Sequence, residues 1–175
     1  MKLHRGSSPY FCILAAVFTE EESAHASDRA IDMIRRQLRK PETYEFHFSH
    51  CPESVRTAFL RGVAPGQFSY QAFVIDKARL YSPKFHDAAT FYEFAVNIVC
   101  DNAGKLMSNG KVVIDKNGNR EFLQRLQCSL KQRVTPEGVR IVRKVAMQDS
   151  RSNNLVQLVV CVRQNADYRG CAEHA

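Results

Sequence analysis

The sequence feature that most constrains the fold is a short apolar segment that ends on a carboxylate. Residues 112–114 form an unbroken β-branched run, which is typical of a strand covered on both faces. Asp115 follows this run, and Asn117 and Gly118 then provide a turn into the next helix. In open α/β sheets, ligands bind beyond the carboxyl ends of strands, so Asp115 stands where a ligand-binding side chain is expected. The alternative is that Asp115 only stabilises the turn, where Asp is a preferred residue.

The rest of the chain alternates apolar strand patterns with amphipathic helix patterns. Strands are predicted at residues 10–18, 68–75, 110–115 and 139–147, and helices at 20–40, 52–63, 119–133, from 87 onward and from 153 onward. Thr19 and Glu22 have the spacing of a capping box for the first helix, and Pro41 is expected to end it. The alternation predicts a single α/β domain over residues 1–162, followed by a polar tail at 163–175.

The composition is that of an ordinary globular protein, with 45% hydrophobic and 25% charged residues in 175. The sequence contains no apolar run of about 18 residues, so no membrane partner is expected. Six cysteines are scattered along the chain without a C-x-x-C pair. This usage indicates a reducing, cytoplasmic compartment.

The charge pattern suggests a polyanionic partner. The formal net charge is +7, and residues 120–175 contain ten Lys or Arg against five Asp or Glu. Such a balance permits binding to the phosphates of a nucleic acid through counterion release, although it also keeps a domain soluble. A second group of cations, Arg35, Arg36, Arg39 and Lys40, ends the first predicted helix, and it is interpreted as a solvated face that complements the helix dipole.

Residues 44–51 concentrate possible metal ligands. In an extended chain Glu45 and His47 share one face, and His50 and Cys51 follow closely. The spacing is irregular and lacks a second ligand pair, so an ordered loop with aromatic plugs is favoured over a zinc site. Two predicted strands end in Asp-Lys, at residues 76–77 and 115–116. These pairs are expected either along one sheet edge or as local charge matches.

Six short motifs in sequence order resemble the domain-of-unknown-function 3800 family between Arg5 and Leu158. They are Gly6-Ser7-Ser8-Pro9-Tyr10-Phe11, Glu45-Phe46-His47-Phe48-Ser49, Val74-Ile75-Asp76-Lys77, Ile114-Asp115-Lys116-Asn117-Gly118, Asp149-Ser150 and Leu155-Val156-Gln157-Leu158. The resemblance implies a ribonuclease-H-like mixed sheet flanked by helices. It also implies an acidic site in which two divalent cations, Mg²⁺ or Mn²⁺, orient a water at a phosphodiester.

Carried over to this chain, the resemblance assigns roles to particular residues. Asp115, Glu45 and Asp149 match the catalytic acids, with Asp115 and Asp149 as metal ligands. The residues expected to meet nucleic acid are Lys77, Lys116 and His47.

The chain also departs from the family pattern. Members begin with a strand carrying Asp-Glu-Ser-Gly, whereas residues 1–5 contain no acid, and the Asp expected on the last helix is absent after Leu158. We therefore expect a degraded, truncated or frame-altered form that retains nucleic-acid binding. The alternatives are an active metal-dependent phosphodiesterase and a structural or protein-interaction module. The absence of the first strand leaves a sheet edge exposed, through which the chain is expected to form a homodimer.

Overall fold

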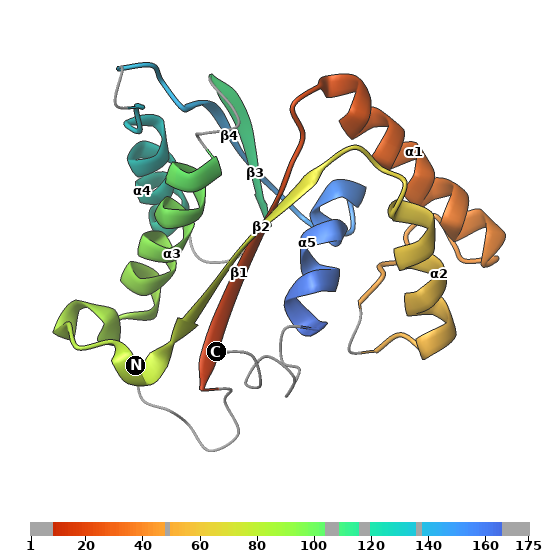
Figure 1. Cartoon of the computed structure of the whole chain (residues 1–175), viewed down its shortest axis with the longest axis horizontal. Coiled ribbons are helices and arrows are strands. Elements are labelled where there is room, and N and C mark those ends of the chain that lie inside the picture. The colour runs from red at the N-terminus through yellow and green to blue at the C-terminus, as the bar shows by residue number, and fades with distance from the viewer. Residues whose placement is uncertain (1–8, 48–49, 104–108, 116–119, 136–137, 166–175) are drawn as a thin grey trace.

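The computed structural model describes residues 9–47, 50–103, 109–115, 120–135 and 138–165 (Figure 1). Its strands are β1 (Tyr10–Val17), β2 (Ser69–Asp76), β3 (Gly110–Asp115) and β4 (Val142–Gln148). Its helices are α1 (Glu21–Gln37), α2 (Glu53–Val63), α3 (Ala88–Ala103), α4 (Arg120–Lys131) and α5 (Asn154–Asn165), with 3₁₀ turns η1 (Lys77–Arg79) and η2 (Pro83–His86). The predicted α/β class is confirmed. Within the described part of the chain, none of the helices is long and apolar enough to cross a membrane.

The described strands form two pairs. β1 is antiparallel to β2, with Tyr10 opposite Asp76 and Val17 opposite Ser69. β3 is parallel to β4, and an irregularity after Gly110 shifts the register of this pair. In the described residues these pairs are separate two-stranded sheets. Helices cover the strands from two sides, with α3 and α4 on one side and α1, α2 and α5 on the other (Figure 1).

The first hydrophobic core covers one face of the β3–β4 sheet. Leu126 and Leu130 of α4 are fully buried there, against Ile114 of β3 and Val145 of β4. Their spacing of four residues places both leucines on the same face of α4. The inward side chains of β3 and β4 are therefore fixed, and the side chains that alternate with them point away from this core.

The second core joins α1, α2 and α5. It contains Ile31, Phe46, Phe59 and Leu158, each at most 1% exposed. Phe46 belongs to the loop between α1 and α2, and its ring lies 4.6 Å from that of Phe59. The predicted aromatic plug is thus present, and it holds the loop that carries Glu45 against α5.

Two of the predicted helix starts carry side-chain caps, whereas α1 starts differently and ends at Gln37, earlier than the Pro41 stop predicted. The Asp87 carboxylate accepts hydrogen bonds from the Thr90 backbone N–H at 2.8 Å and its hydroxyl at 2.6 Å. These bonds favour the charged form and lower the pKa of Asp87. Asn153 Oδ1 likewise accepts from the backbone N–H of Leu155 at 2.9 Å, at the start of α5. The capping box predicted at Thr19 is wrong, because the N-cap of α1 is Glu20 and it makes no side-chain cap hydrogen bond.

Candidate functional site

Two of the predicted acids lie together at the carboxyl ends of neighbouring parallel strands. Asp115 is the last residue of β3 and is paired in register with Gln148, the last residue of β4. Asp149 follows Gln148 directly, and both aspartates are exposed. The local sequence predicted each strand end, and the parallel pairing brings the two carboxylates to the same edge.

Glu45 reaches the same region from the loop after α1. Its Oε1 accepts a hydrogen bond from the Ser150 hydroxyl at 2.5 Å. Its Oε2 lies 3.6 Å from Nε of Arg151, and the Glu45 side chain is 22% exposed. The structure therefore brings Glu45 close to Asp149, with both of its carboxylate oxygens already engaged by side chains of the β4–α5 turn.

Asp149 is also engaged by the turn in which it lies. Its Oδ1 accepts from the backbone N–H of Arg151 at 2.9 Å. Its carbonyl oxygen accepts from the backbone N–H and the hydroxyl of Ser152, each at 2.9 Å. This pattern is that of a turn-stabilising aspartate, which leaves one carboxylate oxygen without such a turn contact.

Gln157 holds this region together, a role that the sequence analysis, which named it only within a motif, did not assign. It is 1% exposed, and its amide N–H donates to the Ser150 carbonyl at 2.8 Å. Its Oε1 accepts from the backbone N–H of Phe46 at 3.2 Å. The loop that carries Glu45 and the turn that carries Asp149 are thus held by one buried amide. The available signal was a polar residue within the apolar pattern of the last helix.

Arg35 corrects one sequence interpretation. It was grouped with a solvated face, but it is 4% exposed. Its guanidinium donates to the Tyr44 carbonyl at 3.0 Å, to Asp32 at 2.6 Å and to Asn154 at 2.7 Å. The interpretation was wrong because Arg35 lies on the inward side of α1 beside Ile31 and Ile34. A buried charge is tolerated when it is paired and hydrogen-bonded, as it is here.

The other predicted contact residues are spread over the molecule. The His47 ring stacks near His50, with 4.5 Å between centroids. Lys77 starts η1, and its backbone N–H donates to the Pro9 carbonyl at 3.0 Å. β2 ends at the lower edge of Figure 1, whereas β3 and β4 end near its centre, so the structure does not bring Lys77 to Asp115. Lys116 lies outside the described residues.

The carboxylates of this region differ from those that two divalent cations, as implied by the family resemblance, would need. A two-cation site needs several carboxylate oxygens directed at shared ions. Glu45 is hydrogen-bonded and ion-paired, and Asp149 supports a turn. Among the residues that the structure describes, no group of three or more His, Cys, Asp or Glu side chains is arranged to hold a metal. The described carboxylates therefore do not by themselves make up a two-cation site.

A basic face lies at the opposite end of the β3–β4 sheet. We use this name for the exposed cations at the starts of β3 and β4, Lys111, Arg140, Arg143 and Lys144; of these, Lys111 and Lys144 share one side of the sheet. Lys111 and Lys144 are register partners on adjacent strands. The backbone N–H of Asn109 donates to the Arg140 carbonyl at 2.7 Å, which places Arg140 at the start of the same sheet. Among the described residues, none of these four side chains takes part in an ion pair.

Comparisons with models of protein families, with curated proteins and with solved structures gave no match. The chemistry of the site is therefore inferred from its residues. The arrangement offers four exposed cations at one end of a sheet and two exposed carboxylates at the other. It is suited to holding a polyanion on the basic face.

Proposed function

We propose that this chain is a ribonuclease-H-like protein, similar to the domain-of-unknown-function 3800 family, that binds nucleic acid without cleaving it. The observation that carries the proposal is the pairing of Lys111 with Lys144 on the exposed start of the β3–β4 sheet. Side chains of this kind bind backbone phosphates and release condensed counterions. The net charge of +7 supports the same partner.

The lysines of the basic face stand on strands that are firmly supported from behind. The opposite face of the sheet is packed on α4 through Ile114 and Val145, so the strands form a rigid support. Between the lysines and the strand ends, the side chains that share their face are small, Val113 on β3 and Ala146 on β4. Val113 and Ala146 are half-buried, whereas the two lysines are exposed, so a nucleic-acid backbone is expected to contact the sheet at its start.

Binding without cleavage is favoured by the state of the acids. Glu45 is engaged by Ser150 and Arg151, and Asp149 by its own turn. A phosphodiesterase that used Mg²⁺ or Mn²⁺ would need these carboxylates as ligands. The alternatives, an active metal-dependent phosphodiesterase and a structural or interaction module, are separate outcomes of the test below.

The test measures binding of a fluorescently labelled nucleic-acid duplex by polarisation, in EDTA, over a series of salt concentrations. We expect the wild-type affinity to fall linearly on a log–log plot against salt. The double variant Lys111→Gln/Lys144→Gln is expected to bind more weakly and to reduce the slope by about 0.9 for each lost phosphate contact. Arg36→Gln/Arg61→Gln is the matched control, because it removes the same charge from exposed positions on α1 and α2.

Three other results would contradict the proposal. Equal losses in the two double variants would show that net charge alone acts and that the basic face has no special role. Absence of salt-sensitive binding by the wild type would favour the structural or interaction module. Cleavage of the duplex on addition of Mn²⁺ would favour the phosphodiesterase.

A further inference from the structure

The outer edge of β2 lacks the features that keep edge strands from associating. β2 has eight residues and pairs regularly with β1 along its whole length. Within the described part of the chain, β1 is its sole strand partner. Residues 69–75 contain no charged residue and no proline. Edge strands of monomeric proteins usually carry a lysine, a proline or a bulge, because these prevent another strand from adding.

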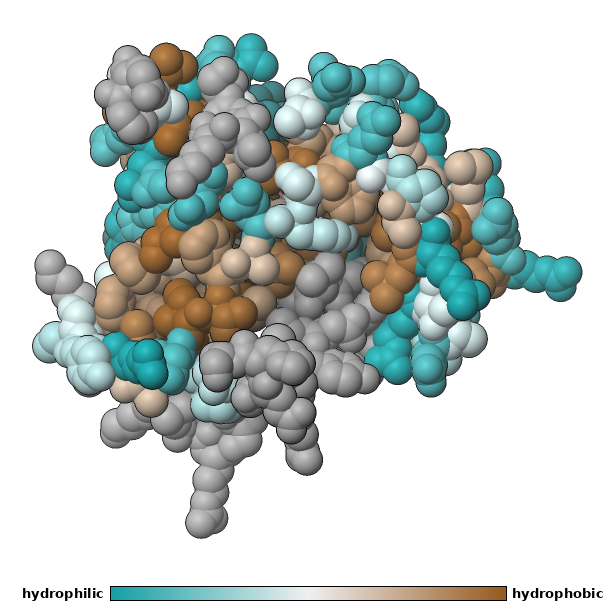
Figure 2. All heavy atoms as spheres, viewed as in Figure 1, coloured by the Kyte–Doolittle hydropathy of each residue, from teal (hydrophilic) through white to brown (hydrophobic). Residues whose placement is uncertain are grey.

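One face of β2 is also apolar and exposed. Tyr70, Ala72 and Val74 alternate along this face, and we call them the β2 stripe. Tyr70 is 41% exposed and Val74 is 63% exposed. On the same face of the sheet, Ala16 of β1 packs against the core that contains Leu158 of α5, whereas Tyr70 and Val74 of the stripe stay exposed. Figure 2 shows a second group of hydrophobic side chains on the surface beside α3, which packs on the other face of this sheet through Phe91 and Phe11.

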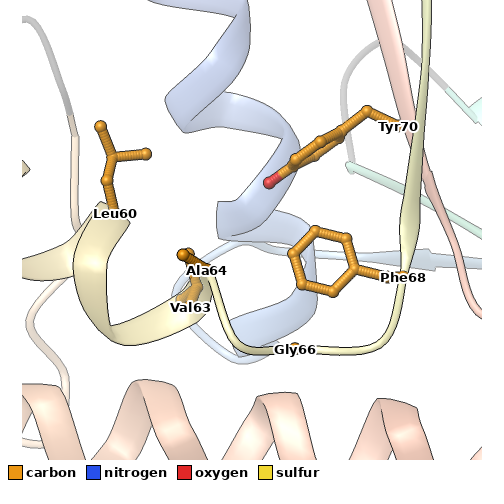
Figure 3. A pocket seen from close by; sticks show the side chains of 6 residues that line it. All are labelled: Leu60, Val63, Ala64, Gly66, Phe68 and Tyr70. Atoms are coloured by element: carbon orange, nitrogen blue, oxygen red, sulfur yellow. The ribbon is translucent and has the colours of Figure 1, made fainter.

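The stripe leads into an apolar pocket. The pocket has a volume of about 440 Å³ and is lined by Leu60, Val63, Ala64, Gly66, Phe68 and Tyr70. The rings of Phe68 and Tyr70 both border the hollow (Figure 3), with their centroids 5.1 Å apart. Leu60, on the other wall, is 39% exposed. Tyr70 belongs to both features, so the stripe and the pocket form one continuous apolar surface.

We propose that a second copy of this chain docks on this surface, with the two β2 strands pairing antiparallel about a two-fold axis. A strand edge is self-complementary in this arrangement, because each copy offers the same backbone groups. An axis through Ala72 sets Tyr70 opposite Val74 of the second copy. An aromatic residue opposite a β-branched residue is a favourable cross-strand pair.

The same axis also brings a side chain of the second copy to the pocket. Val74 of the second copy then lies beside Tyr70, at the mouth of the pocket, and symmetry repeats this contact at the other end of the pair. Because residues 69–75 are uncharged, no like charges face each other across the new strand pair. The dimer has a continuous sheet in the order β1-β2-β2-β1, and it leaves the basic face on the separate β3–β4 sheet.

The experiment measures the mass of the full chain by sedimentation velocity over a concentration series. We expect the wild type to sediment as a dimer at the upper concentrations. Val74→Lys is expected to be monomeric with an unchanged circular dichroism spectrum, because Val74 is largely exposed. Tyr81→Lys is the matched control, since it adds the same charge at a position that is 87% exposed and outside β2.

Salt separates this proposal from the proposed nucleic-acid binding. Two copies that each carry +7 repel one another, so added salt screens the repulsion and strengthens the dimer. Binding to nucleic acid weakens with salt. A wild type that stays monomeric at every concentration and salt level would overturn the proposal, and so would a Val74→Lys variant that still dimerises.

Discussion

At the residue scale, Arg35 shows how a buried charge is accommodated in this fold. Its guanidinium meets a carbonyl from the loop after α1, a carboxylate from its own helix and an amide from the start of α5. Asn154 also donates to Asp32 at 3.0 Å, which closes the network. Asn154 is 119 residues away from Arg35 in the sequence. The local pattern of α1 could not show that Arg35 is buried. The groups that hydrogen-bond its buried charge include Tyr44 and Asn154, which lie outside α1.

The contact between Tyr44 and Cys51 in the loop between α1 and α2 can be tested by titrating Tyr44. The Tyr44 hydroxyl lies 3.3 Å from the Cys51 sulfur, and this hydrogen bond, followed by burial, raises the pKa of Tyr44 to about 12. Replacing Cys51 by Ala removes the largest cause, so the Tyr44 pKa is expected to fall toward its ordinary value of 10.0. Titration of the labelled tyrosine ring carbons by NMR measures this change.

The raised pKa also fixes the direction of a stability effect. The folded state retains the Tyr44 proton to higher pH than the unfolded chain does. The corresponding stabilisation is complete below the unfolded pKa and is lost as the pH rises through about 12. Cys128→Ala is the control, because Cys128 is exposed and free. An unchanged Tyr44 titration in Cys51→Ala would show that the loop contact does not exist in solution.

At the element scale, local patterns predicted most strands and helices. The β-branched run before Asp115 became β3, and the alternation along residues 68–75 became β2 with its exposed Tyr70 and Val74. These predictions succeeded because strand and helix periodicities depend on neighbouring residues. The capping box at Thr19 failed because α1 begins one residue later in the turn, where the Glu20 carbonyl accepts from Ala24 at 3.4 Å.

The packing of α1 on α2 depends on Gly62. A methyl group added there would collide with Cγ1 and Cδ1 of Ile34, which is buried. Overpacking of this kind costs about 1–3 kcal/mol, and the better helix propensity of Ala returns up to about 1 kcal/mol. We therefore expect Gly62→Ala to lower the free energy of unfolding by about 1 kcal/mol, measured by urea denaturation.

Two further variants test whether the loss of stability in Gly62→Ala comes from the contact with Ile34. Arg61→Ala is the control on the exposed side of α2 and is expected to change stability by less than about 0.5 kcal/mol. Ile34→Val removes the colliding Cδ1, so it is expected to cost less in the Gly62→Ala background than in the wild type. Equal costs in both backgrounds would mean that α1 and α2 do not approach closely at Gly62.

At the scale of the whole molecule, the candidate site depends on pairing that the sequence does not display. Lys111 and Lys144 meet because the register shifts after Gly110, where Gly110 pairs with Val142 and Lys111 with Lys144. An unshifted pairing would have set Lys111 beside Arg143. The charge excess in the C-terminal part of the chain was visible in the sequence, but the position of four of these cations at one end of the β3–β4 sheet was not. For the same reason, strand patterns alone did not show that the four strands divide into two sheets.

The remaining acid at the strand ends gives the last prediction. Asp115 shares a sheet face with Lys111, two strand positions further along than Val113. Its negative charge opposes a polyanion on that face, so Asp115→Asn is expected to strengthen binding of a nucleic-acid duplex modestly, in EDTA and in Mn²⁺ alike. Glu42→Gln is the control, because it removes the same charge from an exposed position after α1.

A metal-dependent phosphodiesterase would behave in the opposite way. There Asp115 would be a principal ligand, so its replacement by Asn would abolish cleavage and weaken Mn²⁺ binding, both measurable by gel electrophoresis and calorimetry. A protein that binds through Lys111 and Lys144 instead leaves the duplex intact, with Mn²⁺ affinity that is the same in the wild type and in Asp115→Asn. The sign of the change in duplex affinity therefore decides whether Asp115 repels the ligand's phosphates or holds a cation between them.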